Sequence, residues 1–264
     1  MVHRTRKLST TELRLVVGMK HVVLFSGGLS SAYVAYLVLQ EQKKEDVILL
    51  HTPTYSENHD ADTFRHEVAR HLGVPITEWG LGLDIWELIE KNNCIPGQFI
   101  PFCTQQLKQK MKEQYYKYLK SIGEEFIEYV GFGVEEWKRV QKATARAESI
   151  GRRIEFPIFE QKIPGEEVKR IITEEWGIKL PKAYEHLNHN NCIPCFKAGK
   201  QWWKIYWRHY REQFDKAAEY EEKIGYTVFK GKSLKELAIE WENERLIEEE
   251  QVNLSDLIPC ECWL

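Results

Sequence analysis

The 264-residue sequence has no long apolar run and no marked excess of charge of either sign. A membrane-spanning helix needs roughly 20 apolar residues in succession, and no stretch approaches that length, so we expect no membrane partner. A net charge of −3 argues against binding nucleic acid over the whole surface, although it leaves a local basic groove open. The basic N-terminal segment lacks the apolar core of a secretory signal. These absences favour a cytoplasmic protein.

Cysteine is also sparse for a disulfide-stabilised chain. Six cysteines in a chain of this length are too few for the framework of a small secreted domain. In a reducing compartment, clustered cysteines more often serve a metal site or catalysis. The composition therefore favours a soluble enzyme.

Internal repeats and low-complexity linkers are absent as well, and the apolar residues follow two alternating patterns. Short apolar runs, typical of buried parallel strands, alternate with amphipathic segments between residues 22 and 158. The expected strands are 21–26, 47–50, 74–79, 126–130 and 153–158, the last one stopped by Pro157. The expected helices are 29–42, 61–72, 84–91, 104–119, 135–147, 165–176, 196–223 and 232–250. Pro164 is expected at the first helical position, leading into the helix over 165–176, and a loop is expected over 177–191. This order predicts an α/β fold, in which a parallel sheet of about five strands has helices on both faces and precedes a C-terminal helical lobe.

A turn rich in glycine and serine follows the first expected strand. Residues 25–31 read F-S-G-G-L-S-S, between an apolar run and an amphipathic one. Glycine permits positive φ and close approach of the backbone to a ligand, and N–H groups at a helix start bind phosphate. The alternative is an ordinary turn in which a serine caps the helix. Because ligands of parallel sheets lie beyond the carboxyl ends of the strands, we favour a phosphate site made by Ser26, Gly27, Gly28, Ser30 and Ser31.

Other strand ends extend this predicted site. The segments 51–54 and 131–133 follow two further strands, and a basic helix begins directly after the second of them. Arg139, Lys142 and Arg146 share one face of that helix. They form either an anion clamp or a solvated face, in which a Glu135–Arg139 pair is worth about 0.3–0.5 kcal/mol. We predict a clamp for Arg139 and a solvated position for Arg146. The additional nucleotide-binding residues that we predict are Thr52, Gly131, Gly133, Glu136, Arg139 and Lys142.

The cysteines form a second constellation. Cys192 and Cys195 make a C-x-x-C pair before an expected helix, a spacing that suits a metal or a cluster. Cys103, also at an expected helix start, is the best third ligand. Cys260 and Cys262 lie in the tail, and Cys94 is a weaker candidate. The spacing does not separate zinc from an iron–sulfur cluster, and a dithiol without metal is a further alternative.

These motifs together resemble the phosphoadenosine phosphosulfate (PAPS) reductase family of the adenine nucleotide α-hydrolase-like (PP-loop) superfamily, and most of all its short members carried by phages and mobile elements. The likeness runs from about residue 21 to residue 195. F-S-G-G-L-S-S-A is similar to the family's phosphate-binding loop, and F-C-T-Q-Q-L-K to its C-T-x-x-L-K segment. G-F-G-V-E-E-W-K-R-V and N-N-C-I-P-C resemble its Gly-plus-Glu/Arg segment and its paired cysteines.

The resemblance implies a reaction and a cofactor. It implies thiol-dependent cleavage of PAPS or adenylyl sulfate (APS) to sulfite, with a thioredoxin- or glutaredoxin-type reductant. It also implies a [4Fe–4S] cluster on Cys103, Cys192 and Cys195, with zinc as the alternative metal. We assign Cys260 as a fourth ligand and Cys262 as the nucleophile, with Arg139 over the sulfate. Cys262 and the substrate are the alternative sources of the missing ligand, and because Cys262 cannot be both a ligand and a free nucleophile, these two roles of Cys262 compete.

The implied organisation is an N-terminal extension over 1–20, a nucleotide-binding domain over 21–191 and a helical lobe over 192–264. The sequence leaves open whether the protein forms a homodimer.

Two alternative functions remain at this point. The first is an ATP-dependent iron–sulfur sulfurtransferase that acts on nucleic acid or on a small molecule. Ser30 stands where ATP-cleaving loops of the superfamily carry an acidic residue, which weakens this alternative. Basic residues interleaved with aromatic ones after Cys195 would suit nucleic acid, but we favour a solvated stripe with its tryptophans buried against the sheet. These residues are Lys197, Lys200, Lys204, Arg208 and Arg211, with Trp202, Trp203, Trp207 and Tyr210. The second alternative is a non-catalytic nucleotide-binding module with structural zinc.

Overall fold

The computed structural model describes residues 18–97, 99–187, 189–190 and 192–257. The chain divides into two compact units. The sheet unit consists of Met1–Gly82, of which residues 18–82 are described, and Thr104–Asn190. The helical unit consists of Leu83–Cys103 and Asn191–Leu264. The segment Leu83–Cys103 therefore belongs with the C-terminal part, in addition to the lobe that we expected from residue 192 onward.

The sheet unit is built on five parallel strands in the order β3-β2-β1-β4-β5. The strands are β1 (Lys20–Leu24), β2 (Val47–His51), β3 (Ile76–Glu78), β4 (Phe126–Tyr129) and β5 (Arg153–Glu155). The chain adds β2 and β3 on one side of β1 and then β4 and β5 on the other. Strand order therefore reverses between β1 and β4, which is where open α/β sheets bind their ligands. The predicted parallel α/β sheet is confirmed.

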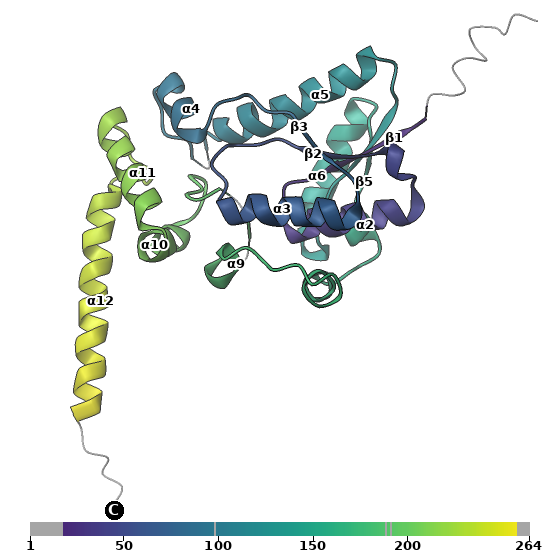
Figure 1. Ribbon diagram of the computed structural model, residues 1–264. Coiled ribbons are helices and arrows are strands. Elements are labelled where there is room, and N and C mark those ends of the chain that lie inside the picture. The colour runs from purple at the N-terminus through teal and green to yellow at the C-terminus, as the bar shows by residue number, and fades with distance from the viewer. Residues whose placement is uncertain (1–17, 98, 188, 191, 258–264) are drawn as a thin grey trace, which may run out of the picture. The chain divides into compact units, whose positions relative to one another are not determined.

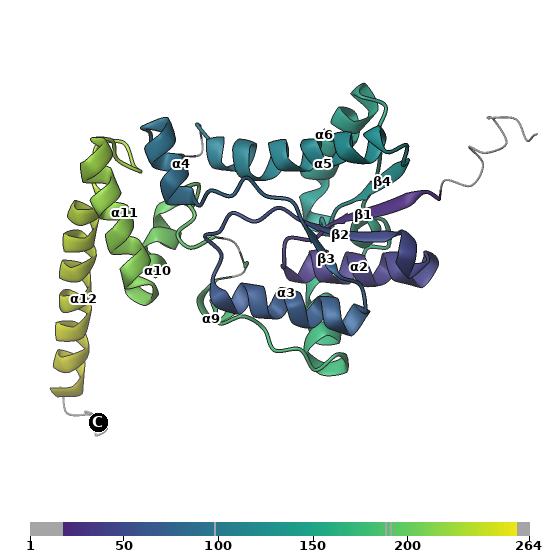
Figure 2. The same ribbon diagram turned by 45° about the horizontal axis from the view of Figure 1, so that its top comes forward.

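Both faces of this sheet are covered by helices (Figure 1). Successive side chains of a strand point to opposite faces, and the neighbours Val22 and Val23 are both fully buried. Val23 packs in a cluster with residues of α2 (Leu29–Glu41) and α3 (His59–Leu72), whereas Val22 packs with Tyr115 and Tyr116 of α5 (Lys110–Ser121). Figure 2 shows α2 and α3 on one side of the strands and α5 on the other. Two-sided burial explains why the strands read as continuous apolar runs rather than alternating ones.

The remaining helices of the sheet unit correct several expected boundaries. They are η2 (Lys44–Asp46), η3 (Thr104–Gln109), η4 (Val134–Glu136), α6 (Trp137–Ser149), α7 (Pro157–Glu160), α8 (Gly165–Arg170), η5 (Ile171–Glu175) and α9 (Ala183–His186). The expected helices over 104–119 and 165–176 each contain a π-helical segment, η3 and η5. Strand β5 ends before Pro157, and this proline opens α7. Pro164 is the N-cap of α8 rather than its first residue, because its ψ of 144° is extended. The expected loop over 177–191 contains α9.

The helical unit has α4 (Ile85–Asn92), α10 (Lys200–His209), α11 (Arg211–Ile224) and α12 (Leu234–Leu257). The expected single helix over 196–223 is two helices, because Tyr210 leaves helical geometry at φ −136° and ψ 55°. Trp203 is fully buried, and its ring contacts Phe196, Tyr206 and Phe214. Of the tryptophans that we expected to be buried against the sheet, Trp203 and Trp207 are buried and Trp202 is half-buried, and the ring contacts of Trp203 come from the helical unit itself. No helix within residues 18–257 is long and apolar enough to cross a bilayer, the undescribed positions aside.

Candidate functional site

The turn between β1 and α2 places a glycine with positive φ directly before the start of a helix. The Phe25 N–H donates to Leu50 at 2.8 Å, which anchors the start of the turn to β2. Gly27 then takes a positive φ of 81°, and α2 begins at Leu29 with Gly28 as its N-cap. No side chain caps the helix, so the alternative of a serine cap is wrong. The first N–H groups of α2 have no acceptor within the helix, and the positive end of its dipole favours an anion there.

The serines of the loop bond to one another and to the backbone. Ser31 donates from Oγ to the Gly28 carbonyl at 2.9 Å, and Ser26 donates from Oγ to Ser31 at 3.3 Å. The side chain of Ser26 is exposed to solvent, whereas that of Ser31 is buried. These bonds use the hydroxyl protons of both serines, so the exposed Ser26 must rotate its hydroxyl away from Ser31 to donate to a phosphate oxygen.

Two residues far along the chain contact this loop, and no local sequence pattern marks either of them. Asn190 donates from Nδ2 to the Gly27 carbonyl at 2.9 Å, and the Leu29 N–H donates to the Tyr184 hydroxyl at 3.4 Å. In a trans peptide the C=O and the next N–H point in opposite directions. Binding of the Gly27 carbonyl by Asn190 therefore turns the Gly28 N–H away from Asn190. The Oδ1 atom of Asn190 is buried and finds no partner among the described residues.

A buried arginine lies against the same loop. Arg65 of α3 is 2% exposed, and its Nη1 atom would be 3.1 Å from a Cβ on Gly27. It forms an ion pair with the half-exposed Asp62, one turn earlier on α3. Burial lowers the pKa of Arg65, whereas Glu57 and Glu78 act to raise it. The guanidinium nevertheless stays charged at neutral pH, as arginine does in proteins.

His51, the last residue of β2, is neutral, and its Nε2 atom is buried. Its Nδ1 atom lies 3.1 Å from the Phe25 carbonyl, and since a carbonyl only accepts, Nδ1 must carry the proton. Nε2 is therefore an acceptor, and it has no partner among the described residues. Burial, followed by the charge of Arg65, lowers the pKa of His51 from 6.5 to about 4.

The loop after β2 is organised by Glu57. Its carboxylate accepts from the Thr54 N–H at 3.0 Å and from the Ser56 N–H at 3.3 Å. Burial acts to raise the pKa of Glu57, but the hydrogen bonds from Thr54 and the charge of Lys108 outweigh it and lower the pKa. Thr52, which we predicted as a ligand residue, is half-buried in this segment.

The segment after β4 meets the phosphate loop. A Cβ on Gly131 would lie 2.8 Å from the Ser30 carbonyl carbon, so the two segments are in direct contact. Gly133 donates its N–H to Glu136 at 2.9 Å. Glu136 also forms an ion pair with Arg139, in place of the i,i+4 pair from Glu135 that we considered. The Arg139 guanidinium lies 4.3 Å above the Phe132 ring and is 63% exposed. Lys142 and Arg146 are exposed farther along α6.

The C-x-x-C pair lies in the helical unit. Cys192 and Cys195 are half-buried, and α10 begins only at Lys200, with Gly199 as its N-cap, rather than directly after Cys195. Burial raises the pKa of the fully buried Tyr206. Electrostatic interaction with Cys195, and less strongly with Cys192, acts in the same direction. The Tyr206 hydroxyl therefore lies close to both thiols.

The described cysteines do not complete a metal site. Within the described part of the chain, no three His, Cys, Asp or Glu side chains are grouped so as to hold a metal ion. Cys103 is half-buried and does not form such a group with Cys192 and Cys195. Cys260 and Cys262 lie outside the described residues. An iron–sulfur cluster or a zinc ion requires at least one further ligand here, so the described residues alone do not fit either group.

Three of the basic residues after Cys195 have acidic partners. Lys204 contacts Glu244 of α12 at 2.6 Å, and Arg211 contacts Asp215 at 2.9 Å. Lys200 lies 4.0 Å from Glu240, also on α12. Pairing with carboxylates reduces the positive potential that this face offers to a nucleic acid.

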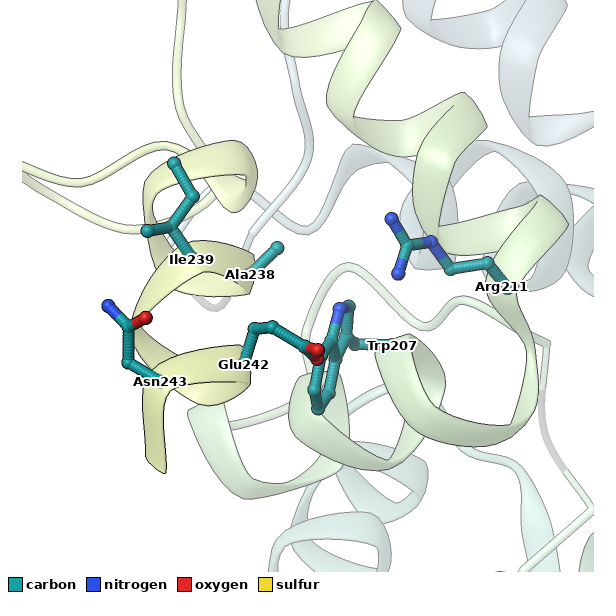
Figure 3. A pocket seen from close by; sticks show the side chains of 6 residues that line it. All are labelled: Trp207, Arg211, Ala238, Ile239, Glu242 and Asn243. Atoms are coloured by element: carbon teal, nitrogen blue, oxygen red, sulfur yellow. The ribbon is translucent and has the colours of Figure 1, made fainter. Parts of the chain in front are cut away.

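A cavity of about 380 Å³ opens between α10, α11 and α12 (Figure 3). The residues that line it are Trp207, Arg211, Ala238, Ile239, Glu242 and Asn243. None of the residues predicted for phosphate or metal binding is among them. Arg211 and Glu242 each have an ion-pair partner outside this lining, Asp215 and Arg245.

Comparisons with known proteins give a likeness of fold only. No protein-family model matches the chain, and no curated protein matches it in sequence. A solved structure of phosphoadenylyl-sulfate (PAPS) reductase from Candida auris, in complex with phosphate, is similar with 14% sequence identity and a TM-score of 0.44. The match covers 69% of this chain and 94% of that one. No conclusion about activity follows from a likeness at this level.

Proposed function

We propose that the sheet unit binds the phosphate of an adenine nucleotide at the turn between β1 and α2, and that the substrate is a sulfonucleotide. The observation that supports this most strongly is the position of the turn. It lies at the reversal of strand order, where Gly27 takes a positive φ and α2 begins directly after Gly28, and helix N-termini in this position favour anions. The sequence resemblance to PAPS reductases supplies the class of substrate, PAPS or APS.

The reaction that we propose uses two thiols. A thiolate attacks the sulfate sulfur, forms a sulfur–sulfur bond and breaks the bond between that sulfur and the phosphate oxygen. AMP or its 3′-phosphorylated form leaves with the electron pair of the broken bond. A second thiolate then attacks the sulfur of the first thiol, a disulfide forms, and sulfite leaves. The two thiols thereby provide the two electrons that reduce sulfate to sulfite.

Each part of this chain has a role in the proposal. The N–H groups and serines of the turn would hold the α-phosphate and stabilise the leaving nucleotide. Arg139 carries an exposed positive charge above Phe132, suited to the sulfate group. Cys262 is the proposed first thiol on the sequence resemblance alone. The second thiol would come from a thioredoxin- or glutaredoxin-type protein.

The test is to measure binding and turnover with four nucleotides. AMP, APS, PAPS and ATP are titrated separately, and sulfite is measured with a dithiol protein as reductant. We expect AMP, APS or PAPS to bind, and sulfite to form from APS or PAPS. Cys262→Ser should abolish sulfite release and leave AMP affinity unchanged, whereas Cys94→Ser, the matched control, should change neither.

Two outcomes would contradict the proposal. Pyrophosphate release from ATP, without sulfite from either sulfonucleotide, would instead support the ATP-dependent sulfurtransferase. Binding of AMP with no turnover of any of these nucleotides would support a non-catalytic module.

A further inference from the structure

Three buried polar side chains surround the backbone from Phe25 to Gly27, and each has at least one atom without a partner among the described residues. The unpartnered atoms are Nε2 of His51, Oδ1 of Asn190, and Nε and Nη1 of Arg65. His51 and Asn190 bind the carbonyls of Phe25 and Gly27, while Arg65 lies along the Cα of Gly27. The first two groups are neutral. Arg65 is therefore the one charged side chain among these three.

Burial of this charge is only partly compensated. A charged side chain taken out of water normally gains a full set of hydrogen bonds and a close counter-charge. The ion pair with Asp62 engages Nη2, and the Asp62 side chain is 50% exposed, so water screens it. Nε and Nη1 remain without acceptors. A charge held in this way lowers the stability of the unliganded protein, which calls for a role that appears when a ligand is present.

The carboxylates near Arg65 indicate that this role is to offset negative charge next to the turn. Glu57 and Glu78 both interact with its charge, in addition to Asp62. Lys108 is a second cation in this region, and it interacts with Glu57. Without Arg65, three carboxylates would face one lysine close to the phosphate loop. The electrostatic potential at the loop would then oppose an anion, whatever hydrogen bonds the loop offered.

We propose that Arg65 is a positioning residue, which supplies the buried positive charge that lets the Ser26–Ser31 turn hold the phosphate of a nucleotide. It acts through the backbone of Gly27, because its guanidinium is shielded from solvent and contacts the loop rather than the ligand. Close packing against the Cα also explains why residue 27 is glycine, since a Cβ there would crowd Nη1 and Cδ of Arg65. The inference rests on the proposed nucleotide-binding function.

The test compares AMP with adenosine, which differ by the phosphate alone. Arg65→Met removes the charge and keeps an unbranched, apolar side chain. We expect it to weaken AMP binding at least about tenfold and to leave adenosine binding unchanged, since a unit charge near the phosphate is worth more than a factor of ten in a partly buried setting. Arg65→Lys should restore most of the AMP affinity. Arg70→Met is the matched control, because Arg70 is exposed on the same helix, and it should have no effect.

Stability provides a second readout that a structural role would not give. Phosphate at saturating concentration should raise the melting temperature of the wild type and not that of Arg65→Met. Asp62→Asn, on the half-exposed partner, should fold normally and bind AMP more tightly than the wild type.

The possible failures are distinguishable. If the wild type binds neither AMP nor inorganic phosphate, the proposed function and this inference both fall. If the wild type binds AMP and Arg65→Met binds it equally well, only the role of Arg65 is overturned. Equal losses of adenosine and AMP affinity with reduced stability would show that Arg65 is merely structural. If Arg65→Met does not fold, Asp62→Asn decides, and an unchanged or weaker AMP affinity in that variant overturns the inference.

Discussion

Gly131 lies directly against Ser30. A Cβ on Gly131 would be 2.8 Å from the carbonyl carbon of Ser30 and 2.9 Å from its oxygen, distances that no ordinary Cβ contact shows. The contact follows from topology, because β1 and β4 are neighbours and the chain leaves both strands at the same edge of the sheet. The shape of the phosphate loop therefore depends on the absence of a side chain at position 131.

Gly131→Ala should deform the loop. The partner atoms belong to the backbone, which cannot turn aside as a flexible side chain would. We expect the free energy of unfolding to fall by about 1–3 kcal/mol, as for overpacking elsewhere in proteins. AMP affinity should fall by about tenfold, which corresponds to 1.4 kcal/mol. Urea unfolding and calorimetric titration measure the two effects.

The matched control for this prediction is Gly165→Ala. Gly165 also lies in the sheet unit, and a Cβ there would meet no atom within 4 Å. This variant should retain both stability and AMP affinity. AMP binding by Gly131→Ala at the wild-type level would show that the loop does not need the close contact.

Stability should depend on pH through His51. Its pKa is about 4 in the folded protein against 6.5 for the free side chain, so the unfolded chain binds more protons between these two values. The corresponding stabilisation, about 3 kcal/mol, is fully present above pH 6.5 and is lost as the pH falls to about 4. His51→Asn keeps an N–H donor for the Phe25 carbonyl but does not titrate. Urea unfolding at several pH values should show a smaller decline below pH 6.5 in this variant, and parallel curves would contradict the prediction.

The sheet and the glycine turn after β1 could be predicted from the sequence for local reasons. Strands buried on both faces appear as unbroken apolar runs, as in β1 and β2. Gly73 ends α3 in the left-handed conformation, as a glycine after a helix is expected to do. The paired glycines of the turn marked a close approach of the backbone, and Gly27 does require its positive φ. In each of these cases one short segment contains the whole signal.

The supports of the site depend on contacts distant in sequence, and here the sequence was insufficient. Asn190 and Tyr184 reach the loop from 163 and 155 residues away, and no local pattern marks either residue. An arginine inside an amphipathic helix is expected on the solvent side, but Arg65 is buried where Gly27 leaves space for it. The segment Leu83–Cys103 joins the helical unit through contacts of Trp86 with Phe196 and Tyr220. Such contacts follow from the folded arrangement and not from periodicity.

Arg139 provides a test of the proposed anion clamp. Its exposed ion pair with Glu136 should be worth little, so Arg139→Ala should change the free energy of unfolding by less than about 0.5 kcal/mol. If the guanidinium faces the sulfate, the same variant should weaken APS or PAPS binding by about tenfold while AMP binding changes much less. Comparing the affinity for APS or PAPS with the affinity for AMP separates the contribution of the sulfate group from that of the phosphate.

Arg146→Ala serves as the control for Arg139, because Arg146 is exposed on the same helix and we assign it no role in binding. Equal, small effects of the two variants on every ligand would show that this face of α6 is only solvated.

Metal content tests the cysteine assignment independently of the nucleotide site. Cys192 and Cys195 lie near the Tyr206 hydroxyl, but the described residues supply no complete ligand set, so we expect a bound metal to take a further ligand from Cys260 or Cys262 of the tail. We predict that protein purified without oxygen is brown and holds about four iron atoms and about four sulfide ions per chain. Cys195→Ser and Cys260→Ser should each lower the iron content sharply. Cys94→Ser should not, because the Cys94 thiol contacts the neighbouring Ile95 carbonyl and belongs to no group of possible metal ligands among the described residues. Colourless protein with about one zinc ion would replace the cluster with a structural metal, and metal-free protein with full nucleotide binding would leave Cys192 and Cys195 as a dithiol.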